Sequence, residues 1–428
     1  MAIIYNLINI LLIAIYLPIF VFKKKIHRGF SMRLGILPKG VAFYRPVWIH
    51  AVSVGEMANM RQLVAGLAGS IPDKQFVFST VTPTGNKIAL SIARKQDAVI
   101  FLPLDLSWIV NSVLGRIKPS LFVIAETEFW PNIICALYRR KVPVIVVNGR
   151  ISDRSAAGYS RVRRLIAPLL RKVTLFCMQT QADAQRIISL GADPGSVKVT
   201  GNMKFDQRAG VSLEHRDLLK RQMNILPDEK LLVAGSTHPG EEDHVVSAYL
   251  KIISQYPFVR LLIAPRHPER SSELEKTIRK YGLEPVRISG LKTSACSGRC
   301  VFILDTIGVL VSYYSLADVV FVGGSLVKHG GQNFLEPAFL GKPVIIGPYL
   351  FNFRDIARQF LDQRAAIMVR SADELSMAVS TLLTDKTQAA ALVERAKELI
   401  RRNQGATERN AAYIKEYALM KKSDTISI

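Results

Sequence analysis

A carboxylate that follows a run of small residues is the first candidate for chemistry in this sequence. Glu56 comes after Ser53 and Gly55, close behind the apolar run 47–51. The small side chains leave room for a hydroxyl group to approach, and a carboxylate within reach of that hydroxyl can remove its proton as a general base. The simpler interpretation is that Glu56 is an acidic residue in the first turn of a helix, where it stabilises the helix dipole.

Two further glutamates and one lysine follow other apolar runs. Glu126 and Glu128 flank Thr127, and side chains two apart on an extended segment share a face, so both can line one site. Structural ion pairs with the many surrounding cations are an equally good explanation. Lys204 lies just before the expected linker, residues 206–211, where a cation can stabilise negative charge that develops on a leaving phosphate or a sugar carboxylate. A lone lysine is more often simply solvated.

A glycine-rich stretch, residues 322–337 (V-G-G-S-L-V-K-H-G-G-Q-N-F-L-E-P), dominates the second half. Its two glycine pairs let backbone N–H groups approach a ligand, and a helix that begins near Asn333 adds free N–H donors, so phosphate is expected here. Glu336 can then accept hydrogen bonds from ribose hydroxyls. Alternatively, Asn333 and Glu336 form only a capping box. Arg266 can make a two-pronged contact with phosphate or with a pyrimidine edge, or only pair with Glu269.

The elements that must position these residues alternate between strands and helices from Pro46 onward. Strands are expected at the apolar runs 47–51, 75–79, 98–102, 121–125, 144–147, 175–178, 197–200, 231–234, 261–264, 301–304, 319–322 and 344–346. Apolar strands that alternate with helices are typical of a parallel sheet covered on both faces. Ligands bind at the carboxyl ends of such strands, which is where the candidate residues lie.

The length of 428 residues exceeds what one core usually supports. We expect two doubly wound, Rossmann-like α/β domains, 23–208 and 209–428, that face each other across a cleft, with a final helix that packs back on the first domain. Residues 1–22 are expected to be a membrane anchor, because residues 3–22 are almost wholly apolar and about long enough to cross a bilayer. The lysines that follow place the remainder on the cytoplasmic side. A cleaved signal peptide is disfavoured, since the segment has no basic start and no small-residue cleavage site.

The net charge of +23 is concentrated in the first half, where residues 1–208 contain 28 Lys and Arg against 10 Asp and Glu. An anionic membrane leaflet or an acidic substrate is therefore expected to face this half. One basic cluster is interleaved with leucine and isoleucine, which favours an anionic lipid surface over nucleic acid. Its cations are Arg150, Arg154, Arg161, Arg163, Arg164, Arg171 and Lys172.

No catalytic metal is expected. His238, His244 and His267 do not have the i, i+4 spacing of a helical zinc site, and the sequence has no Asp-x-Asp element.

Seven motifs together resemble one known family. The runs W-I-H-A-V-S-V-G-E, E-T-E-F-W-P-N, N-G-R-I-S-D-R-S-A-A-G-Y, G-N-M-K-F-D, A-G-S-T-H-P-G-E-E, A-P-R-H-P-E-R and H-G-G-Q-N-F-L-E-P are similar to those of 3-deoxy-D-manno-octulosonic acid (Kdo) transferases, in the same order and up to about Arg354. The resemblance implies a GT-B glycosyltransferase that moves Kdo from CMP-Kdo to the lipid A precursor at the cytoplasmic face of the inner membrane. The implied reaction inverts the sugar configuration, uses no cofactor or metal, and contributes to lipopolysaccharide biosynthesis.

The resemblance also implies roles for individual residues. Glu56 would accept the proton of the acceptor hydroxyl, and Glu126 and Lys204 would stabilise the transition state. CMP would be bound by Pro265, Arg266, Thr306, Ile307, Gly308, Asn333, Phe334, Leu335 and Glu336. The acceptor is expected at Ser53, Gly55, Glu128 and Arg150.

Two alternatives to this interpretation differ in nucleotide or in activity. Another GT-B enzyme, such as a nucleotide-sugar epimerase or a peptidoglycan-type transferase, would prefer UDP to CMP. A non-catalytic, membrane-tethered lipid-binding protein would explain the charge and the anchor, but would leave Glu56 dispensable. The number of Kdo residues transferred is not encoded in these motifs.

Overall fold

The computed structural model describes residues 5–11, 13–15, 29–38, 40–207, 211–291 and 300–420 of the chain. The chain divides into two compact units, of which the first comprises Met1–Asp206 and Asn403–Ile428 and the second Gln207–Arg402. The division falls at the expected linker, while the C-terminal residues from Asn403 join the first unit. Each unit is described by itself.

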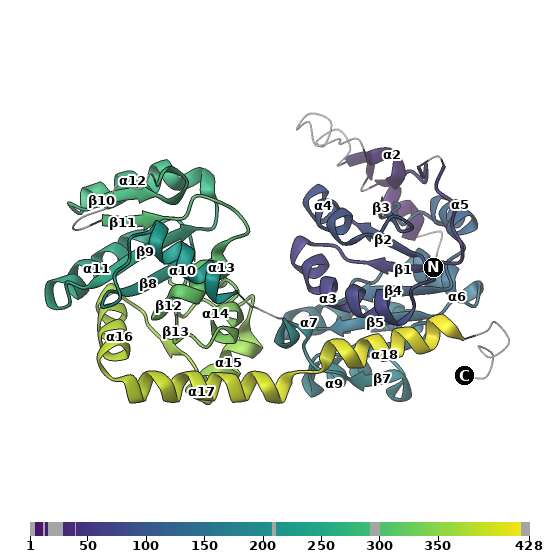
Figure 1. Ribbon diagram of the computed structural model, residues 1–428. Coiled ribbons are helices and arrows are strands. Elements are labelled where there is room, and N and C mark those ends of the chain that lie inside the picture. Colours follow the sequence, from purple (N-terminus) through teal and green to yellow (C-terminus); the bar gives the residue numbers. More distant parts are fainter. Residues whose placement is uncertain are drawn as a thin grey trace. The chain divides into compact units, whose positions relative to one another are not determined.

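The described residues of the first unit form a parallel sheet of seven strands in the order β3-β2-β1-β4-β5-β6-β7 (Figure 1). The strands are β1 (Val47–His50), β2 (Phe76–Thr80), β3 (Ala98–Phe101), β4 (Leu121–Ala125), β5 (Val144–Gly149), β6 (Leu175–Met178) and β7 (Val197–Val199). The helices are α2 (Phe30–Arg33), α3 (Val54–Ser70), α4 (Pro83–Ile92), α5 (Ser107–Ile117), α6 (Pro131–Arg139), α7 (Asp153–Arg161), α8 (Arg163–Leu170), α9 (Gln181–Leu190) and α18 (Ala406–Leu419), with 3-10 turns η1 (Pro194–Ser196) and η2 (Met203–Asp206). The chain order reverses between β1 and β4, and this is where ligands bind in such sheets.

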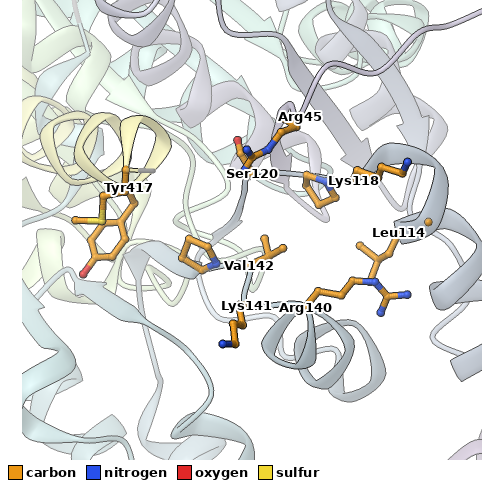
Figure 2. Close-up of a pocket in the computed structure, with 12 residues that line it drawn as sticks. Arg45, Leu114, Lys118, Ser120, Arg140, Lys141, Val142 and Tyr417 are labelled. Carbon is orange, nitrogen blue, oxygen red and sulfur yellow. The ribbon is translucent and has the colours of Figure 1, made fainter. Parts of the chain in front are cut away.

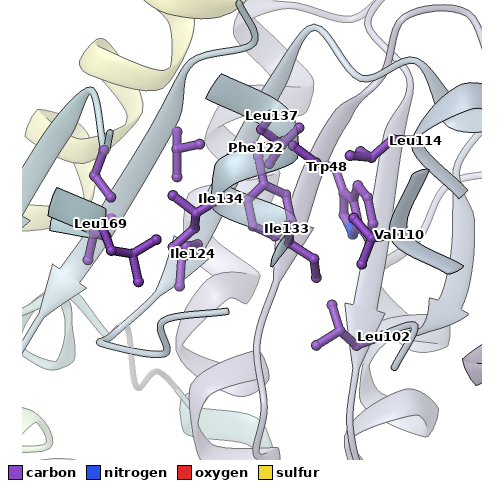
Figure 3. Close-up of a cluster of buried hydrophobic side chains, with 14 of the residues drawn as sticks. Trp48, Leu102, Val110, Leu114, Phe122, Ile124, Ile133, Ile134, Leu137 and Leu169 are labelled. Carbon is purple, nitrogen blue, oxygen red and sulfur yellow. The ribbon is translucent and has the colours of Figure 1, made fainter. Parts of the chain in front are cut away.

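Alternate side chains of these apolar strands pack against different layers of helices. Trp48, Phe122 and Ile124 on one face pack with residues of α5, α6, α8 and α9, and Figure 3 shows part of this cluster. Ile49 and Val123 on the other face pack with α3, α4 and α18. Burial on both faces is what the uninterrupted apolar strands predicted.

Helix α18, formed by the end of the chain, completes the second face of this sheet. Ala406, Ile414 and Ala418 contribute to the core there. Asp206 fixes the start of the helix, because its carboxylate accepts hydrogen bonds from the N–H groups of Gly405 (2.6 Å) and Thr407 (2.5 Å). Segments some 200 residues apart in the sequence thus belong to one unit.

The second unit has the same architecture. Its described residues form a parallel sheet of seven strands in the order β10-β11-β9-β8-β12-β13-β14. The strands are β8 (Lys230–Thr237), β9 (Val259–Pro265), β10 (Glu284–Arg287), β11 (Cys300–Ile303), β12 (Val319–Val322), β13 (Val344–Ile346) and β14 (Ile367–Met368). The helices are α10 (Leu213–Gln222), α11 (Glu242–Gln255), α12 (Ser271–Lys280), α13 (Leu310–Leu316), α14 (Leu335–Phe339), α15 (Arg354–Asp362), α16 (Ala372–Thr384) and α17 (Lys386–Asn403), with 3-10 turns η3 (Pro268–Arg270) and η4 (Ile288–Gly290). The prediction of an α/β fold with two parallel sheets is confirmed.

Two strands and one helix start differ from the sequence-based expectation. The edge strands β10 and β14 were not predicted, because β10 is a half-exposed Glu-Pro-Val-Arg segment and β14 has only two residues. The helix expected near Asn333 begins at Leu335, with Phe334 at the position before it. The side-chain oxygen of Asn333 accepts a hydrogen bond from the N–H of Leu335 (3.3 Å).

The expected N-terminal anchor is described only in part. Residues 5–11 and 13–15 are helical, while 1–4, 12 and 16–22 of the predicted span lie outside the described residues. Asn6 ties this segment to the first unit through hydrogen bonds with Ser107 (2.8 Å) and Asn132 (2.8 Å). Over the residues that the structure describes, no helix combines the length and the apolar character that crossing a membrane requires. The membrane-spanning anchor is therefore not supported by the described part of the chain.

Candidate functional site

The predicted catalytic residues of the first unit, and the predicted acceptor-binding Arg150, follow strands at the carboxyl edge of its sheet. Glu56 lies in the first turn of α3 after β1, Glu126 follows β4, and Arg150 follows β5. The strands β1, β4 and β5 are adjacent. Lys204 reaches the same edge from η2, which follows β7. The fold thus places these four side chains around the position where the strand order reverses.

Glu56 forms a capping box with Ser53 at the start of α3. The N–H of Glu56 donates to Ser53 Oγ (3.2 Å), and Ser53 Oγ donates to Glu56 Oε1 (2.8 Å). Glu56 Oε2 accepts a hydrogen bond from the N–H of Val52 (2.8 Å). Capping therefore fixes the orientation of this half-buried carboxylate, and Gly55 beside it is exposed. The capping interpretation and the base interpretation are both compatible with this geometry.

Glu126 lies in an electrostatic cluster with three of the other candidates. Burial raises the pKa of Glu126, and repulsion from Glu56 raises it further, while the charges of Lys204 and Arg150 oppose this shift. Burial also lowers the pKa of Lys204, and the negative charge of Glu126 opposes this shift. Glu126 has a left-handed backbone, with φ of 58°, a conformation that costs a non-glycine residue free energy and is concentrated at functional sites.

Glu128 belongs to the same cluster. Burial raises the pKa of its carboxyl group, and repulsion from Glu56 and Glu126 adds to this. Thr127 between the two glutamates donates its hydroxyl hydrogen bond to the carbonyl of Arg150. This bond ties the loop after β4 to the loop after β5. Three carboxylates and two cations thus share one rim, where the pKa values of Glu126 and Glu128 are held above their usual range.

A buried amide network positions Lys204, and sequence reasoning missed it. Asn148 is fully buried, and its Oδ1 accepts the N–H of Met203 (3.0 Å). Gln179 donates to the carbonyl of Asn148 (2.9 Å) and accepts from Asn202 (2.9 Å). The Oδ1 of Asn202 then accepts the N–H of Lys204 (3.0 Å). The available signal was the N-G-R motif itself, in which only the arginine was weighed.

The first glycine pair of the second unit binds a carboxylate of the chain itself. Glu241 is fully buried, and its Oε2 accepts the N–H groups of Gly324 (2.7 Å) and His238 (3.1 Å). Its Oε1 accepts those of Ser325 (3.0 Å) and Leu326 (2.8 Å). Burial raises the pKa of Glu241, and these N–H donors lower it. The expectation that this turn offers free N–H groups to phosphate is wrong, because an internal anion already takes them.

Beside this turn, histidine rings surround the end of β8. The ring of His238 stacks on that of His329, with centroids 4.2 Å apart, and meets the edge of the His267 ring at 6.1 Å. His238 Nε2 is 3.0 Å from the side-chain nitrogen of Gln332. Burial lowers the pKa of His238 to about 4, and the charges of His329, His267 and Arg266 contribute in the same direction. His238 is therefore neutral at pH 7 and an acceptor for Gln332.

The predicted CMP-binding residues are brought together only in part. The side chain of Asn333 donates to the carboxylate of Glu336 (3.0 Å). The capping-box alternative is wrong in detail, because Phe334 takes the N-cap position of α14 and makes no side-chain cap hydrogen bond. Burial raises the pKa of Glu336, whereas the hydrogen bond from Asn333 and the charge of Arg266 lower it. These three side chains therefore form one polar cluster. Pro265 is buried at the end of β9 next to Arg266.

The other predicted CMP-binding residues differ in accessibility. The side chains of Phe334 and Leu335 are fully buried, so only their backbone can meet a ligand. Thr306, Ile307 and Gly308 form an exposed loop after β11, in which Ile307 is 83% exposed. Within the described part of the chain, no hydrogen bond or ion pair joins this loop to Arg266. Over the same residues, no group of three or more His, Cys, Asp and Glu side chains is arranged to hold a metal ion.

Comparison with known proteins agrees with the resemblance seen in the sequence. Residues 28–207 match the model of the family described as 3-deoxy-D-manno-octulosonic-acid transferase (kdotransferase). The 3-deoxy-D-manno-octulosonic acid transferase of Haemophilus influenzae is 33% identical over 377 residues, which cover 87% of each chain. That of Chlamydia trachomatis is 28% identical over 401 residues, which cover 92% of this chain and 91% of the other.

A bifunctional glycosyltransferase/methyltransferase of Fusobacterium nucleatum is 36% identical over 390 residues, which cover 89% of this chain. The chain spans 59% of the length of that protein.

Solved structures share the fold at low sequence identity. A glycosyltransferase from Rickettsia africae has a TM-score of 0.59 at 12% identity and covers 88% of this chain and 100% of its own. The UDP-GlcNAc 2-epimerase from Neisseria meningitidis has a TM-score of 0.57 at 14% identity, with 87% and 99% covered. These two likenesses concern the α/β fold alone. The sequence matches show that the chain belongs to the 3-deoxy-D-manno-octulosonic acid transferase family of glycosyltransferases.

Proposed function

We propose that this glycosyltransferase moves Kdo from CMP-Kdo to a hydroxyl group of the phosphorylated lipid A precursor, with inversion at the sugar carbon. The observation that carries the proposal is the rim cluster of Glu56, Glu126, Lys204 and Arg150, at the strand reversal of a chain that belongs to the Kdo transferase family. Direct attack by the acceptor oxygen as CMP leaves inverts the configuration and requires one base.

Glu56 is the base in this mechanism. Its two oxygens are held by Ser53 and the N–H of Val52, and a carboxylate oxygen has further lone pairs with which to accept the acceptor proton. Ser53 and Gly55 leave the space in which that hydroxyl binds. A positioned base of this kind contributes about 10²–10⁴ in rate.

Glu126 and Lys204 stabilise the charge that develops around the reacting sugar. Their pKa shifts run toward each other, upward for the acid and downward for the amine, because both are removed from water. Charges in such a site act more strongly than charges in water. Glu128 and Arg150 at the same rim are proposed to contact the acceptor, with Arg150 suited to a phosphate group.

The second unit is proposed to bind CMP through Arg266 and the segment 333–336. The charge of Arg266 lowers the pKa of Glu336, so the two side chains interact electrostatically. In the proposal, the guanidinium of Arg266 binds the phosphate of CMP and the carboxylate of Glu336 binds the ribose hydroxyls. The exposed loop of Thr306, Ile307 and Gly308 is assigned to the nucleotide on the family resemblance alone. The leaving group carries a single phosphate, so we assign no metal to the reaction and give its usual role to the fixed cations.

The acceptor is a lipid, and we propose that the enzyme works at the cytoplasmic surface of the inner membrane. Two surfaces support this. The described helical residues near the N-terminus expose Leu7 (60%) and Leu11 (62%), while the neighbouring Asn6 is hydrogen-bonded to Ser107. Helix α8 exposes Leu165 (54%), and Val162 between α7 and α8 is 44% exposed, among the exposed arginines of the basic cluster. Apolar groups amid cations suit an anionic bilayer.

Thermal-shift titration with CMP and UDP tests the donor assignment. CMP is expected to raise the unfolding temperature of the full chain at lower concentration than UDP, because a ligand stabilises the state that it binds. An Arg266→Ala variant should lose most of the CMP response. A stronger response to UDP would refute the CMP assignment and favour an enzyme that uses a UDP-sugar.

A further inference from the structure

A pocket lies at the edge of the first sheet where the strands begin, opposite the edge that carries the proposed catalytic residues. Its volume is about 510 Å³, which is within the range of small-molecule sites. The pocket is lined by Arg45, Leu114, Gly115, Lys118, Pro119, Ser120, Arg140, Lys141, Val142, Pro143, Tyr417 and Met420. All belong to the first unit. The lining precedes β1, β4 and β5, whose other ends carry Glu56, Glu126 and Arg150, so this pocket is separate from the proposed catalytic rim.

The pocket combines an apolar floor with a cationic border. Pro119 and Pro143 are buried, whereas Arg45, Lys118 and Lys141 are exposed. In Figure 2 the labelled cations lie around Val142, with Tyr417 on one side and Leu114 on the other. No Asp or Glu is among the described residues that line the pocket.

The cations are available to a ligand. Arg140 donates one hydrogen bond to the carbonyl of Ala136 (3.2 Å) and keeps its other N–H groups. Over the described residues, Arg45, Lys118 and Lys141 make no side-chain hydrogen bond or ion pair with a carboxylate. These four cations line one pocket that has no carboxylate among its described lining residues, and an anion bound there offsets their mutual repulsion.

Three of the four cations have a left-handed backbone. The φ angles are 47° at Arg45, 48° at Lys118 and 55° at Lys141. Glycine adopts this conformation without penalty, while a residue with a side chain pays roughly 1 kcal/mol. The sequence thus places long cationic side chains at positions where glycine would make the fold more stable.

Helix ends explain part of this arrangement. Lys118 follows α5, and Arg140 and Lys141 follow α6, and a cation after the last turn of a helix gains about 0.3–1 kcal/mol from the helix dipole. Arg45 follows no α-helix, because it lies in the loop before β1. The helix dipole also gives no reason for the buried proline floor or for Tyr417 at its side.

We propose that this pocket binds a phosphate-bearing anion that also carries an apolar or aromatic group. The border of Arg45, Lys118, Arg140 and Lys141 pairs with the phosphate oxygens. The floor of Pro119, Val142 and Pro143 and the ring of Tyr417 receive the apolar part. A nucleoside diphosphate and the head group of an anionic phospholipid share this chemistry. Tyr417 and Met420 come from α18 and its end, so the ligand holds the C-terminal helix against the strand starts.

The test uses glycine at the left-handed positions, because this removes charge while it relieves the backbone. In the full-length chain, the double variant Lys118→Gly/Lys141→Gly is expected to unfold at the same or a higher temperature than the wild type. The matched control is Arg364→Gly in the second unit, which also has a left-handed cation, with φ of 51°, and lies outside the pocket.

Isothermal titration calorimetry at low salt measures binding of adenosine diphosphate and inorganic pyrophosphate, and cosedimentation measures binding to vesicles of phosphatidylglycerol in phosphatidylcholine. Saturable binding of a soluble probe that weakens about tenfold or more in the double variant, and not in Arg364→Gly, supports a soluble ligand. The same difference seen only with vesicles supports a lipid head group. Equal binding by the wild type and the double variant in every assay, or no binding at all, overturns the proposal.

Discussion

Replacement of Glu56 separates its two roles, as a helix cap and as a base. Its carboxylate accepts hydrogen bonds of 2.8 Å from Ser53 Oγ and from the N–H of Val52. Loss of both in Glu56→Ala should cost about 0.5–2 kcal/mol of folding free energy. Glu56→Gln keeps one acceptor oxygen and should cost less. Neither change is large enough to unfold a domain of this size.

The loss of transfer activity should be much larger than the loss of stability. A general base contributes about 10²–10⁴ in rate, which is about 2.7–5.5 kcal/mol of transition-state free energy. We therefore expect kcat/KM of both variants to fall by this factor, measured by the transfer of Kdo from CMP-Kdo to the lipid A precursor. The free energy of unfolding, from urea titration, is the parallel measurement.

Helix α16 provides the matched control. Ser371 accepts the N–H of Glu374 (3.1 Å), and Glu374 Oε2 accepts the N–H of Arg370 (2.8 Å). These two hydrogen bonds at the start of α16, in the second unit, correspond to those that Ser53, Glu56 and Val52 make at the start of α3 in the first unit. Glu374→Ala should lower stability as much as Glu56→Ala and leave kcat unchanged. If Glu56→Gln and Glu374→Gln reduce transfer equally, or by less than about tenfold, Glu56 is only a cap and the base assignment is refuted.

Substitutions at three further residues test the catalytic rim and the end of β8. Asn148→Ala should lower the free energy of unfolding by about 1–3 kcal/mol, since the buried N–H of Met203 loses its acceptor, and should lower kcat because Lys204 is less well positioned. Asn148→Gly also removes the acceptor but relieves the left-handed φ of 53°, so it separates the hydrogen bond from the backbone effect. An unchanged kcat in both variants would disprove the positioning role of Asn148. Because the pKa of Glu126 is raised in the folded state, its ionisation lowers the stability of the fold above the folded-state pKa and has no effect below the unfolded-state pKa. Glu126→Gln should therefore be more stable than the wild type at pH 7 in urea titrations, and the difference should shrink toward pH 4. A difference that stays constant with pH would contradict the raised pKa. His238, with its pKa lowered to about 4, contributes stability that is present above pH 6.5 and lost as pH falls through 4. His238→Gln should therefore flatten the dependence of the unfolding free energy on pH in this range. An unaltered pH dependence would show that the pKa of His238 is not lowered.

The layered fold could be predicted because its signal is local. Buried parallel strands are short apolar runs, and β4, β6, β12 and β13 begin and end at the predicted residues. The edge strands β10 and β14 were missed, since an edge strand needs no apolar run and is recognised only by its pairing with β11 and β13. Neither pairing leaves a trace in the sequence at that position.

The candidate site could be predicted only as far as strand ends reveal it. Glu56, Glu126 and Arg150 follow predicted strands, and the rule for parallel sheets placed them at one edge. The network of Asn148 depends on three loops that meet in space, which no spacing along the chain encodes. Glu241 shows the same limit, because a glycine turn looks alike whether its N–H groups bind a phosphate or an internal carboxylate.

Mass spectrometry of the lipid product tests the central claim most directly. The purified chain is incubated with the lipid A precursor and either CMP-Kdo or a UDP-sugar, without added metal and in the presence of a chelator. The account predicts a product heavier by one or more Kdo residues with CMP-Kdo, formed about 10²–10⁴-fold more slowly when Glu56→Gln replaces the wild type. An unmodified lipid with CMP-Kdo, or a product formed only from the UDP-sugar, would contradict it.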